Sequence, residues 1–176
     1  LTVRLTKFTP SCAGMGGGSA DGAAVLRLLW EHYDHPISRE ELFLLAEQTG
    51  SDVPFTLLGG TALAREKGQV LTRLPKLPSC HFVICKPDFP ISTPALFRAI
   101  DDAEIVAHPD TRGMLAALER GDLAAIAHGL ANVFTPVVAK DHPEIGEIRD
   151  IMLSSGALGA EMTGSGPTVF GIFTDP

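Results

Sequence analysis

The stretch "PSCAGMGGGSADGAA", residues 10–24, carries five glycines and leads directly into a run that favours a helix. The N-terminus of a helix presents unpaired N–H groups and the positive end of the helix dipole. Glycines in front of it let a ligand approach the backbone closely, so the combination can hold a phosphate. A flexible turn is the simpler interpretation, and the loop alone does not decide between the two.

This loop differs from the common phosphate-binding patterns. The GxxxxGK[ST] pattern is absent because no lysine follows the glycines, and GxGxxG is incomplete because Ser19 breaks its register. We therefore expect backbone amides and Ser19, rather than a loop lysine, to hold any phosphate.

The segments on either side of the loop have opposite periodicities. "AAVLRLLWEHY", residues 23–33, has helical spacing that places Val25, Leu28 and Leu29 on one side. "LTVRLTKF", residues 1–8, alternates apolar and polar residues and predicts a half-buried strand. No initiator Met precedes this strand, so we expect the chain to be a fragment.

The next elements have clear end signals. Ser38 and Glu41 form a capping box, and Gly50 suits the C′ position of the same helix. The extended runs "TALARE" and "QVLTRLP" then predict a hairpin around Gly68.

A linker divides the chain in this prediction. "PKLPS", residues 75–79, has two prolines around a short polar stretch and suggests domains at 1–77 and 78–176. Strands that bracket several helices predict an α+β second half with its helices on one face of the sheet. We expect a strand at 80–86, a pair of strands around 162–167 and a last strand at 168–173. Helices are expected from Thr93 and near 111–119, 122–130 and 143–155.

Composition narrows the function classes. The chain has 176 residues, is 45% hydrophobic and has a formal net charge of −7, so broad attraction to nucleic acid or anionic membranes is not expected. No apolar run is long enough for a membrane span, and no signal peptide is recognisable, which favours the cytoplasm. Cys12, Cys80 and Cys85 show no metal spacing and are expected to be small buried hydrophobes, and no zinc site is expected from the dispersed histidines.

Four segments in sequence order resemble the GHMP kinases across nearly the whole chain. They are "PSCAGMGGGSADGAA", "GSDVPFTLLGGTALAREKGQVLTRLP", "PDFPISTPALF" and "AEMTGSGPTVFGIF". The triple glycine is most similar to the branch that phosphorylates the 2-hydroxyl of a cytidine diphosphate methylerythritol in the non-mevalonate isoprenoid route. The resemblance implies an α+β fold with a ferredoxin-like C-terminal domain and a partial N-terminal domain like ribosomal protein S5 domain 2.

The resemblance also implies specific ligands. ATP and Mg²⁺ would serve the reaction, in a monomer or homodimer, and no residue is assigned to the metal. The residues that match the ATP-binding loop are Pro10, Ser11, Cys12, Ala13, Gly14, Met15, Gly16, Gly17, Gly18, Ser19 and Ala20.

Asp52 matches the catalytic aspartate of the family. A carboxylate there would orient or deprotonate the acceptor hydroxyl as it attacks the γ-phosphate. Without the resemblance, Asp52 before Val53 and Pro54 would be interpreted as a helix N-cap.

The second half of the chain contains further matches. Thr93 and Phe97 match positions that contact the cytidine, although Thr93 could also be an N-cap and Phe97 a core residue. The third motif would bring a supporting loop close to the nucleotide loop, although a simple hairpin turn would use the same residues. Its members are Thr163, Gly164, Ser165 and Gly166.

Two departures from the family pattern stand out. The first motif, a strand with a lysine that works with the aspartate, has no match here. Many relatives have a second serine where this chain has Ala20, and Asp21 then follows in what we expect to be the first helical turn. Another GHMP kinase, such as a homoserine or mevalonate type, and a truncated module that binds nucleotide without turnover therefore remain as alternatives.

Overall fold

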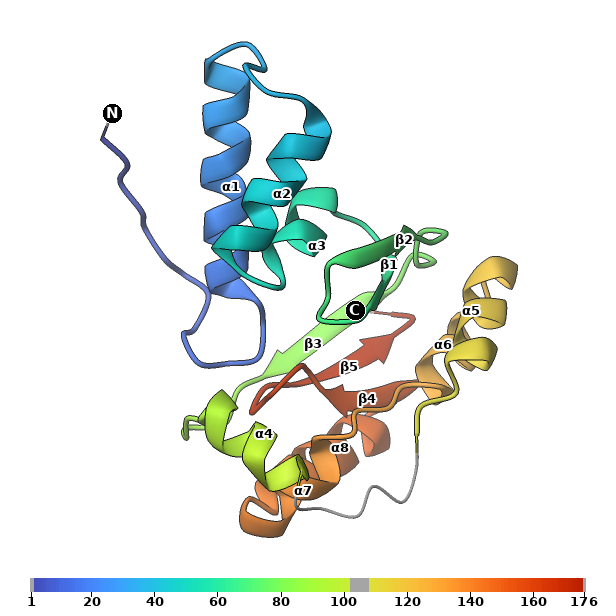
Figure 1. Ribbon diagram of the computed structural model, residues 1–176. Coiled ribbons are helices and arrows are strands. Elements are labelled where there is room, and N and C mark those ends of the chain that lie inside the picture. The colour runs from blue at the N-terminus through green and yellow to red at the C-terminus, as the bar shows by residue number, and fades with distance from the viewer. Residues whose placement is uncertain (1, 102–107, 176) are drawn as a thin grey trace. The chain divides into compact units, whose positions relative to one another are not determined.

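The computed structural model of the protein describes residues 2–101 and 108–175. The chain forms two compact units, one of residues 1–11 and 16–76 and the other of residues 12–15 and 77–176. The glycine-rich loop therefore passes from the first unit into the second and back. The elements of both units are labelled in Figure 1.

The first unit is mainly helical. Its core combines small and branched side chains from each helix, which allows the helices to pack closely: Ala23, Leu42, Ala46, Val53 and Leu57. The helices are α1 (Gly17–His32), α2 (Arg39–Thr49) and α3 (Val53–Leu58).

Helix α1 buries a different face from the predicted one. Ala23 is buried, and Leu26 and Trp30 pack against the same core. Leu28 is 65% exposed, so the predicted stripe that included it is wrong. Several faces of this sequence are apolar, and the packing of α2 and α3 selects among them.

The start of α2 confirms the capping box. Glu41 N donates to Ser38 Oγ at 3.2 Å, and Ser38 N donates to Glu41 Oε2 at 2.8 Å. The backbone N–H of Ser38, and to a lesser extent its hydroxyl, lowers the pKa of the Glu41 carboxyl below its ordinary value of 4.5, because hydrogen bonds to the carboxylate favour the charged form. The helix ends before Gly50 as expected, but Gly50 has an extended backbone with φ 169° rather than the left-handed one.

The predicted hairpin is confirmed. Strands β1 (Ala62–Arg65) and β2 (Val70–Arg73) pair antiparallel, and the turn between them uses Gly68 at φ 105°. This positive φ favours glycine there.

The predicted N-terminal strand is wrong. Residues 2–8 form no strand in the described part of the chain, and Val3 and Leu5 are 57% and 60% exposed. Alternation alone produces no strand, because a strand also needs a neighbour to accept and donate its ladder hydrogen bonds.

The second unit contains an antiparallel sheet. Its strands lie in the order β3-β5-β4, as Figure 1 shows. They are β3 (His81–Cys85), β4 (Gly159–Met162) and β5 (Val169–Phe173). The strands predicted near these positions are therefore confirmed.

The helices of the second unit match the predicted segments, and α7 is an addition. Asp110 and Asp122 cap α5 and α6 by accepting from Gly113 N at 2.9 Å and Ala125 N at 3.0 Å. The helices are α4 (Thr93–Asp101), α5 (Thr111–Arg120), α6 (Leu123–His128), α7 (Thr135–Asp141) and α8 (Glu144–Ser154). Helix α7 lacks a capping side chain, because Phe134 occupies its N-cap position without a side-chain hydrogen bond, and its first-turn proline, Pro136, was the one local sign of its start.

Helices pack on both faces of this sheet, so the prediction of one covered face is wrong. Gly159 pairs with Ile172 and Ala160 pairs with Gly171, so Gly159 and Gly171 face opposite sides. A Cβ at Gly159 would overlap Ala127 of α6, whereas one at Gly171 would lie 3.1 Å from the Met152 sulfur of α8. Glycine at both positions allows each helix to approach its face closely.

Within residues 2–101 and 108–175, no helix combines the length and apolar character needed to cross a bilayer.

Candidate nucleotide and substrate site

The glycine-rich loop opens α1 with unpaired amides. Gly16 is the N-cap in the left-handed conformation, with φ 63°, and its carbonyl accepts the first helical bond from Ala20 N at 2.9 Å. Among the described residues, no group accepts a hydrogen bond from the N–H of Gly17, Gly18 or Ser19. These amides at the positive end of the helix dipole are free to receive an anion.

The space around these glycines is open. A Cβ at Gly16 or Gly18 would meet no described atom within 4 Å, whereas one at Gly17 would lie 3.3 Å from Thr9. Packing within the protein therefore does not explain the glycine at Gly18. A ligand close to the backbone would explain it.

Lys7 is a cation beside this loop that the sequence reasoning did not identify. It pairs with Asp21, and its Nζ would lie 3.5 Å from a Cβ at Gly17. Because α1 begins at Gly17, Asp21 lies in the second turn and binds a cation, so the prediction that it serves the dipole from the first turn is wrong. The only sequence signal was a lysine shortly before the glycines rather than after them.

Asp52 lies at the start of α3 without capping it. Its side chain makes no cap hydrogen bond, its own backbone is helical, and it is exposed. The next residue, Val53, packs in the core, with a side-chain carbon 3.7 Å from a Cβ position at Gly22 of α1. The first unit therefore holds a free carboxylate on a helix that packs directly against α1.

The hairpin turn lies beside this carboxylate. A Cβ at Gly68 would lie 3.1 Å from Ser51 O and 3.8 Å from Asp52 Oδ1. Glycine at this position thus leaves room next to the carboxylate.

The earlier part of the loop packs against the third motif inside the second unit. Thr163 Oγ1 donates to Gly14 O at 3.1 Å, and a Cβ at Gly14 would lie 2.7 Å from Gly166 N. The turn therefore fits only a glycine at position 14, which also has φ 68°. The structure brings these residues together, and their contact with a nucleotide stays a prediction.

The other loop positions vary in exposure. Ala13 is buried, Met15 is half-buried, and the remainder are exposed: Pro10, Ser11, Cys12 and Ala20. The expectation of buried cysteines is wrong for Cys12, which is exposed on the loop, while Cys80 and Cys85 are half-buried.

Thr93 is not a helix N-cap and Phe97 is not a core residue, so neither takes the structural alternative named above. Leu96 N donates to Ser92 O at 2.9 Å, so Ser92 rather than Thr93 occupies the cap position of α4. Thr93 Oγ1 instead lies 3.0 Å from Ser165 Oγ, which links α4 to the third motif. Phe97 is 53% exposed and meets the Phe134 ring edge-on, with centroids 5.2 Å apart, so it is not a core residue.

A small cavity lies next to the loop in the second unit. It measures about 290 Å³, and its lining includes Met15, Thr163 and Thr168. The Thr168 hydroxyl is buried and has no hydrogen-bond partner among the described residues. The other lining residues, Phe82, Ile84 and Phe170, belong to one face of the sheet.

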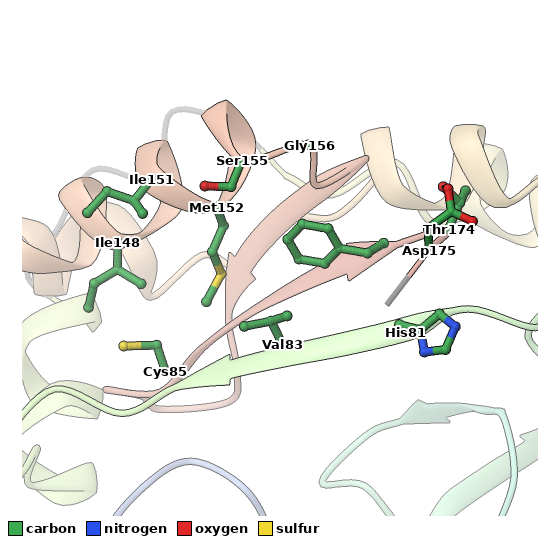
Figure 2. A pocket seen from close by; sticks show the side chains of 11 residues that line it. His81, Val83, Cys85, Ile148, Ile151, Met152, Ser155, Gly156, Thr174 and Asp175 are labelled. Atoms are coloured by element: carbon green, nitrogen blue, oxygen red, sulfur yellow. The ribbon is translucent and has the colours of Figure 1, made fainter.

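A larger cavity of about 730 Å³ lies on the other face of that sheet. Figure 2 shows Val83 and Cys85 of β3 opposite Ile148 and Met152 of α8. Because alternate residues of β3 face opposite sides, this cavity is separate from the one that Met15 lines.

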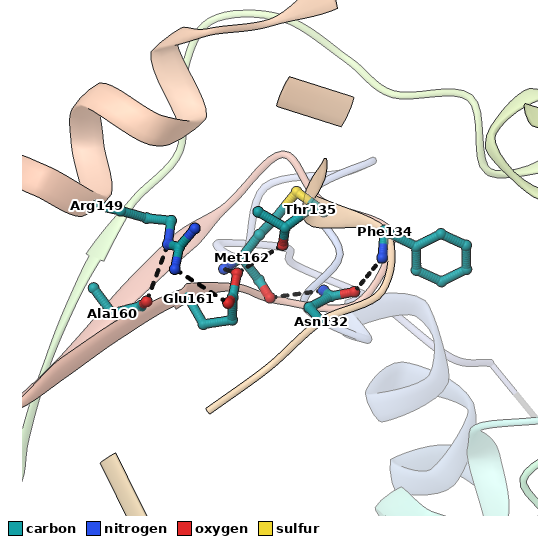
Figure 3. A network of polar contacts seen from close by, with 7 residues as sticks. All are labelled: Asn132, Phe134, Thr135, Arg149, Ala160, Glu161 and Met162. Atoms are coloured by element: carbon teal, nitrogen blue, oxygen red, sulfur yellow. Dashed lines mark hydrogen bonds and ion pairs between the residues drawn. The ribbon is translucent and has the colours of Figure 1, made fainter. Parts of the chain in front are cut away.

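A polar network under the third motif was also missed. Asn132 donates to Met162 O and Gly164 O, both at 2.8 Å, and Figure 3 shows its place between Met162 and Phe134. In the same network, Thr135 Oγ1 donates to the buried Glu161 at 2.6 Å. No local pattern identifies such residues, because their partners are about 30 positions away along the chain.

Comparison with known proteins matches both parts of the chain to one family. Residues 1–60 match the N-terminal domain of the GHMP kinases, and residues 114–176 match their C-terminal domain. The 4-diphosphocytidyl-2-C-methyl-D-erythritol kinase of Pelotomaculum thermopropionicum is 47% identical over 98% of this chain and 60% of that relative. The enzyme of the same name from Caldicellulosiruptor saccharolyticus is 42% identical over 99% of this chain and 60% of that relative.

Solved structures agree with these matches. A crystal structure of 4-(cytidine 5'-diphospho)-2C-methyl-D-erythritol kinase is 36% identical, with a TM-score of 0.77 over 94% of this chain and 59% of that chain. A homoserine kinase from Cytophaga hutchinsonii, 20% identical, has a TM-score of 0.79 over 96% of this chain and 59% of that chain, which shows the shared fold. The predicted α+β fold is thus confirmed, and the chain spans about 60% of the length of the curated relatives that it matches.

Proposed function

Because this chain belongs to the GHMP kinase family, we propose that it is the main part of an ATP-dependent kinase that phosphorylates 4-diphosphocytidyl-2-C-methyl-D-erythritol on its 2-hydroxyl. The observation that carries the proposal is the start of α1. There, unpaired amides of Gly17, Gly18 and Ser19 adjoin open space in a chain 47% identical to a kinase of that name.

The nucleotide proposal rests on charge and access. A triphosphate needs hydrogen-bond donors and positive potential, and the free amides with the dipole of α1 supply both. Lys7 adds a cation near the same amides, although its pairing with Asp21 already neutralises part of that charge. In a protein with a formal net charge of −7, this compensation has to be local.

Asp52 is the proposed catalytic residue. Its carboxylate forms no cap bond, so it is available to orient the acceptor hydroxyl or accept its proton as the γ-phosphoryl group is transferred. The packing of α3 against α1 holds this carboxylate on the same rigid unit as the loop amides. Asp52 is thus exposed to solvent, and the helix that follows it is held in place by the core of the first unit.

We expect the phosphates of the nucleotide, rather than a cluster of protein side chains, to supply most of the ligands of Mg²⁺. No group of three His, Cys, Asp or Glu side chains converges in the part of the chain that the structure describes. Mg²⁺ in kinases is commonly held by phosphates with one or two carboxylates, and Asp52 is the free carboxylate near the loop helix. When bound, the ion would neutralise phosphate charge.

The acceptor proposal involves the second unit. Thr93 and Phe97 are the proposed contacts to the cytidine, since the exposed Phe97 ring offers a stacking face to a pyrimidine.

A coupled assay of ADP release tests this function. The full-length protein is incubated with ATP, Mg²⁺ and one alcohol at a time: 4-diphosphocytidyl-2-C-methyl-D-erythritol, homoserine or mevalonate. We expect turnover with the cytidine compound alone. Preference for homoserine or mevalonate would assign another GHMP activity, and ATP binding without turnover on any of them would contradict a kinase function.

A further inference from the structure

We propose that Asn132 is a positioning residue that sets the nucleotide loop and the Phe134–Phe97 aromatic pair at the same time. The proposal rests on the kinase function above, and it concerns a residue to which neither the motifs nor the family resemblance assigned a role. Three hydrogen bonds carry it.

Both polar atoms of the Asn132 side chain bind protein groups. Its Nδ2 donates to Met162 O and to Gly164 O, both at 2.8 Å, and its Oδ1 accepts from Phe134 N at 2.9 Å. Two carbonyls and one amide fix the orientation of the side-chain amide, because only its nitrogen can donate. Its donors are fully used in this way, so Asn132 acts through the groups that it holds rather than through a ligand.

The donor side of Asn132 leads to the nucleotide loop. The two carbonyls that it binds lie on either side of Thr163, whose hydroxyl donates to Gly14 O at 3.1 Å. A Cβ at Gly164 would lie 2.9 Å from the same Gly14 oxygen, so turn and loop are in direct contact. Gly14 belongs to the glycine-rich loop that we propose binds the nucleotide, so we expect its position to affect nucleotide binding.

The acceptor side leads to the predicted cytidine site. The bond to Phe134 N fixes the residue whose ring meets Phe97 edge-on, with an interplanar angle of 78°. A separate link joins α4 to the turn, since Thr93 Oγ1 lies 3.0 Å from Ser165 Oγ. Asn132 is thus connected to both Phe97 and the nucleotide loop.

Buried polar side chains support the backbone at Met162, next to Asn132. Glu161 accepts from Thr135 Oγ1 at 2.6 Å and from Met162 N at 2.8 Å, and Arg149 Nη2 lies 3.5 Å from its other oxygen, as Figure 3 shows. The amide and the carbonyl of Met162 are therefore both bound by side chains, the amide by Glu161 and the carbonyl by Asn132. If the bonds of Asn132 are lost, the neighbouring groups have little freedom to move and compensate for them.

Two variants in the full-length protein separate the two sides. Asn132→Asp keeps the acceptor for Phe134 N but replaces two donors by a carboxylate that repels the carbonyls of Met162 and Gly164. We expect the KM for ATP and the Kd for a non-hydrolysable ATP analogue to rise roughly tenfold, because two hydrogen bonds, one part-buried and one exposed, are replaced by repulsion between the new carboxylate and the two carbonyls. The KM for the cytidine substrate should change less than threefold, on the order of experimental scatter.

Phe134→Leu is the matched variant for the other side. It keeps the backbone N–H that Asn132 binds and removes the ring that meets Phe97. Here we expect a several-fold rise in the KM for the cytidine substrate, with ATP-analogue affinity unchanged. Parallel losses in both substrates for both variants, following the loss of thermal stability, would show a merely structural role and overturn the proposal.

A further variant and a second measurement keep the test decisive. If Asn132→Asp does not fold, Thr163→Val removes the contact to Gly14 one step further along and should also weaken ATP-analogue binding alone. Analogue affinity and hydrogen exchange at residues 162–166 need no acceptor substrate. A wild type that fails to phosphorylate the cytidine compound therefore contradicts the proposed function, whereas unchanged analogue affinity and exchange in Asn132→Asp contradict the role of Asn132.

Discussion

Thr163 donates a hydrogen bond from its hydroxyl to the carbonyl of Gly14, at 3.1 Å, across 149 positions of sequence. The two glycine-rich segments, each compatible with an isolated turn, therefore meet in one packed contact. Gly14 and Gly164 both lack space for a Cβ at this contact. Residues 12–15 of the loop thus pack within the second unit.

The glycines of the loop differ in what constrains them, and alanine substitutions should reveal this. Gly14→Ala forces a Cβ against Thr163 O at a φ of 68°, so we expect a loss of about 2 kcal/mol or more in the free energy of unfolding. Chemical denaturation with a fit of the midpoint and slope measures it.

Gly18→Ala is the matched variant of the same loop. A Cβ at Gly18 meets no described atom within 4 Å, so the free energy of unfolding should stay unchanged or rise by up to about 1 kcal/mol. ATP-analogue affinity should nevertheless fall, since the methyl group occupies space next to the free amides. Unaltered affinity in calorimetry would mean that phosphates do not approach Gly18.

Asp52→Asn should separate catalysis from folding. The carboxylate makes no cap bond, so stability should change little, while kcat falls by about a hundredfold to ten-thousandfold and ATP binding is kept. Steady-state kinetics and thermal denaturation of the same preparation measure both.

Asp110→Ala and Asp122→Ala serve as controls for Asp52. Both residues cap helices with their side chains, and each variant should lose about 1 kcal/mol of stability without a change in kcat. If Asp52→Asn behaves like these controls, Asp52 is a structural residue.

Substitutions at two adjacent positions in α4 should affect different properties, one substrate binding and the other stability. Phe97→Ala removes a ring that is 53% exposed, so it should raise the KM for the cytidine substrate by roughly tenfold at little cost in stability. Leu96→Ala removes a core side chain that is 5% exposed, and it should cost about 2–5 kcal/mol. A stability loss for Phe97→Ala equal to that of Leu96→Ala would contradict a role in binding.

The capping box of α2 predicts a pH dependence. Hydrogen bonds to Ser38 hold the pKa of Glu41 below its ordinary value of 4.5, so the ionised form stabilises the fold above that value and this contribution is lost as the pH falls through the lowered pKa. Glu41→Gln keeps the size of the side chain but removes its charge, so it should destabilise the fold at neutral pH. Denaturation at a series of pH values should show the difference from wild type shrinking in acid, and a constant difference would argue against the coupling.

Local signals predicted the elements whose ends are determined by short-range chemistry. The capping box of Ser38 and Glu41 and the hairpin turn at Gly68 each involve residues within a few positions of one another. Such bonds join residues that are close in the sequence, so a local pattern can indicate them.

The outcomes that sequence reasoning missed depend on distant partners. Residues 2–8 alternate as a strand does but lack a neighbour among the described residues, and α1 buries Ala23 and Leu26 because α2 and α3 lie on that side. Lys7 and Asn132 likewise bind partners that are distant in the sequence, Asp21 in the first case and Met162 and Gly164 in the second.

The sequence by itself determined the glycine loop, the helix that follows it and the family resemblance, because periodicity, caps and motifs are properties of neighbouring residues. Only the tertiary structure decided that Asp52 leaves its carboxylate uncapped, that Phe97 lies outside the core and that Gly14 packs on Thr163. Burial and hydrogen bonding between distant segments depend on which surfaces meet, and no local pattern contains that information.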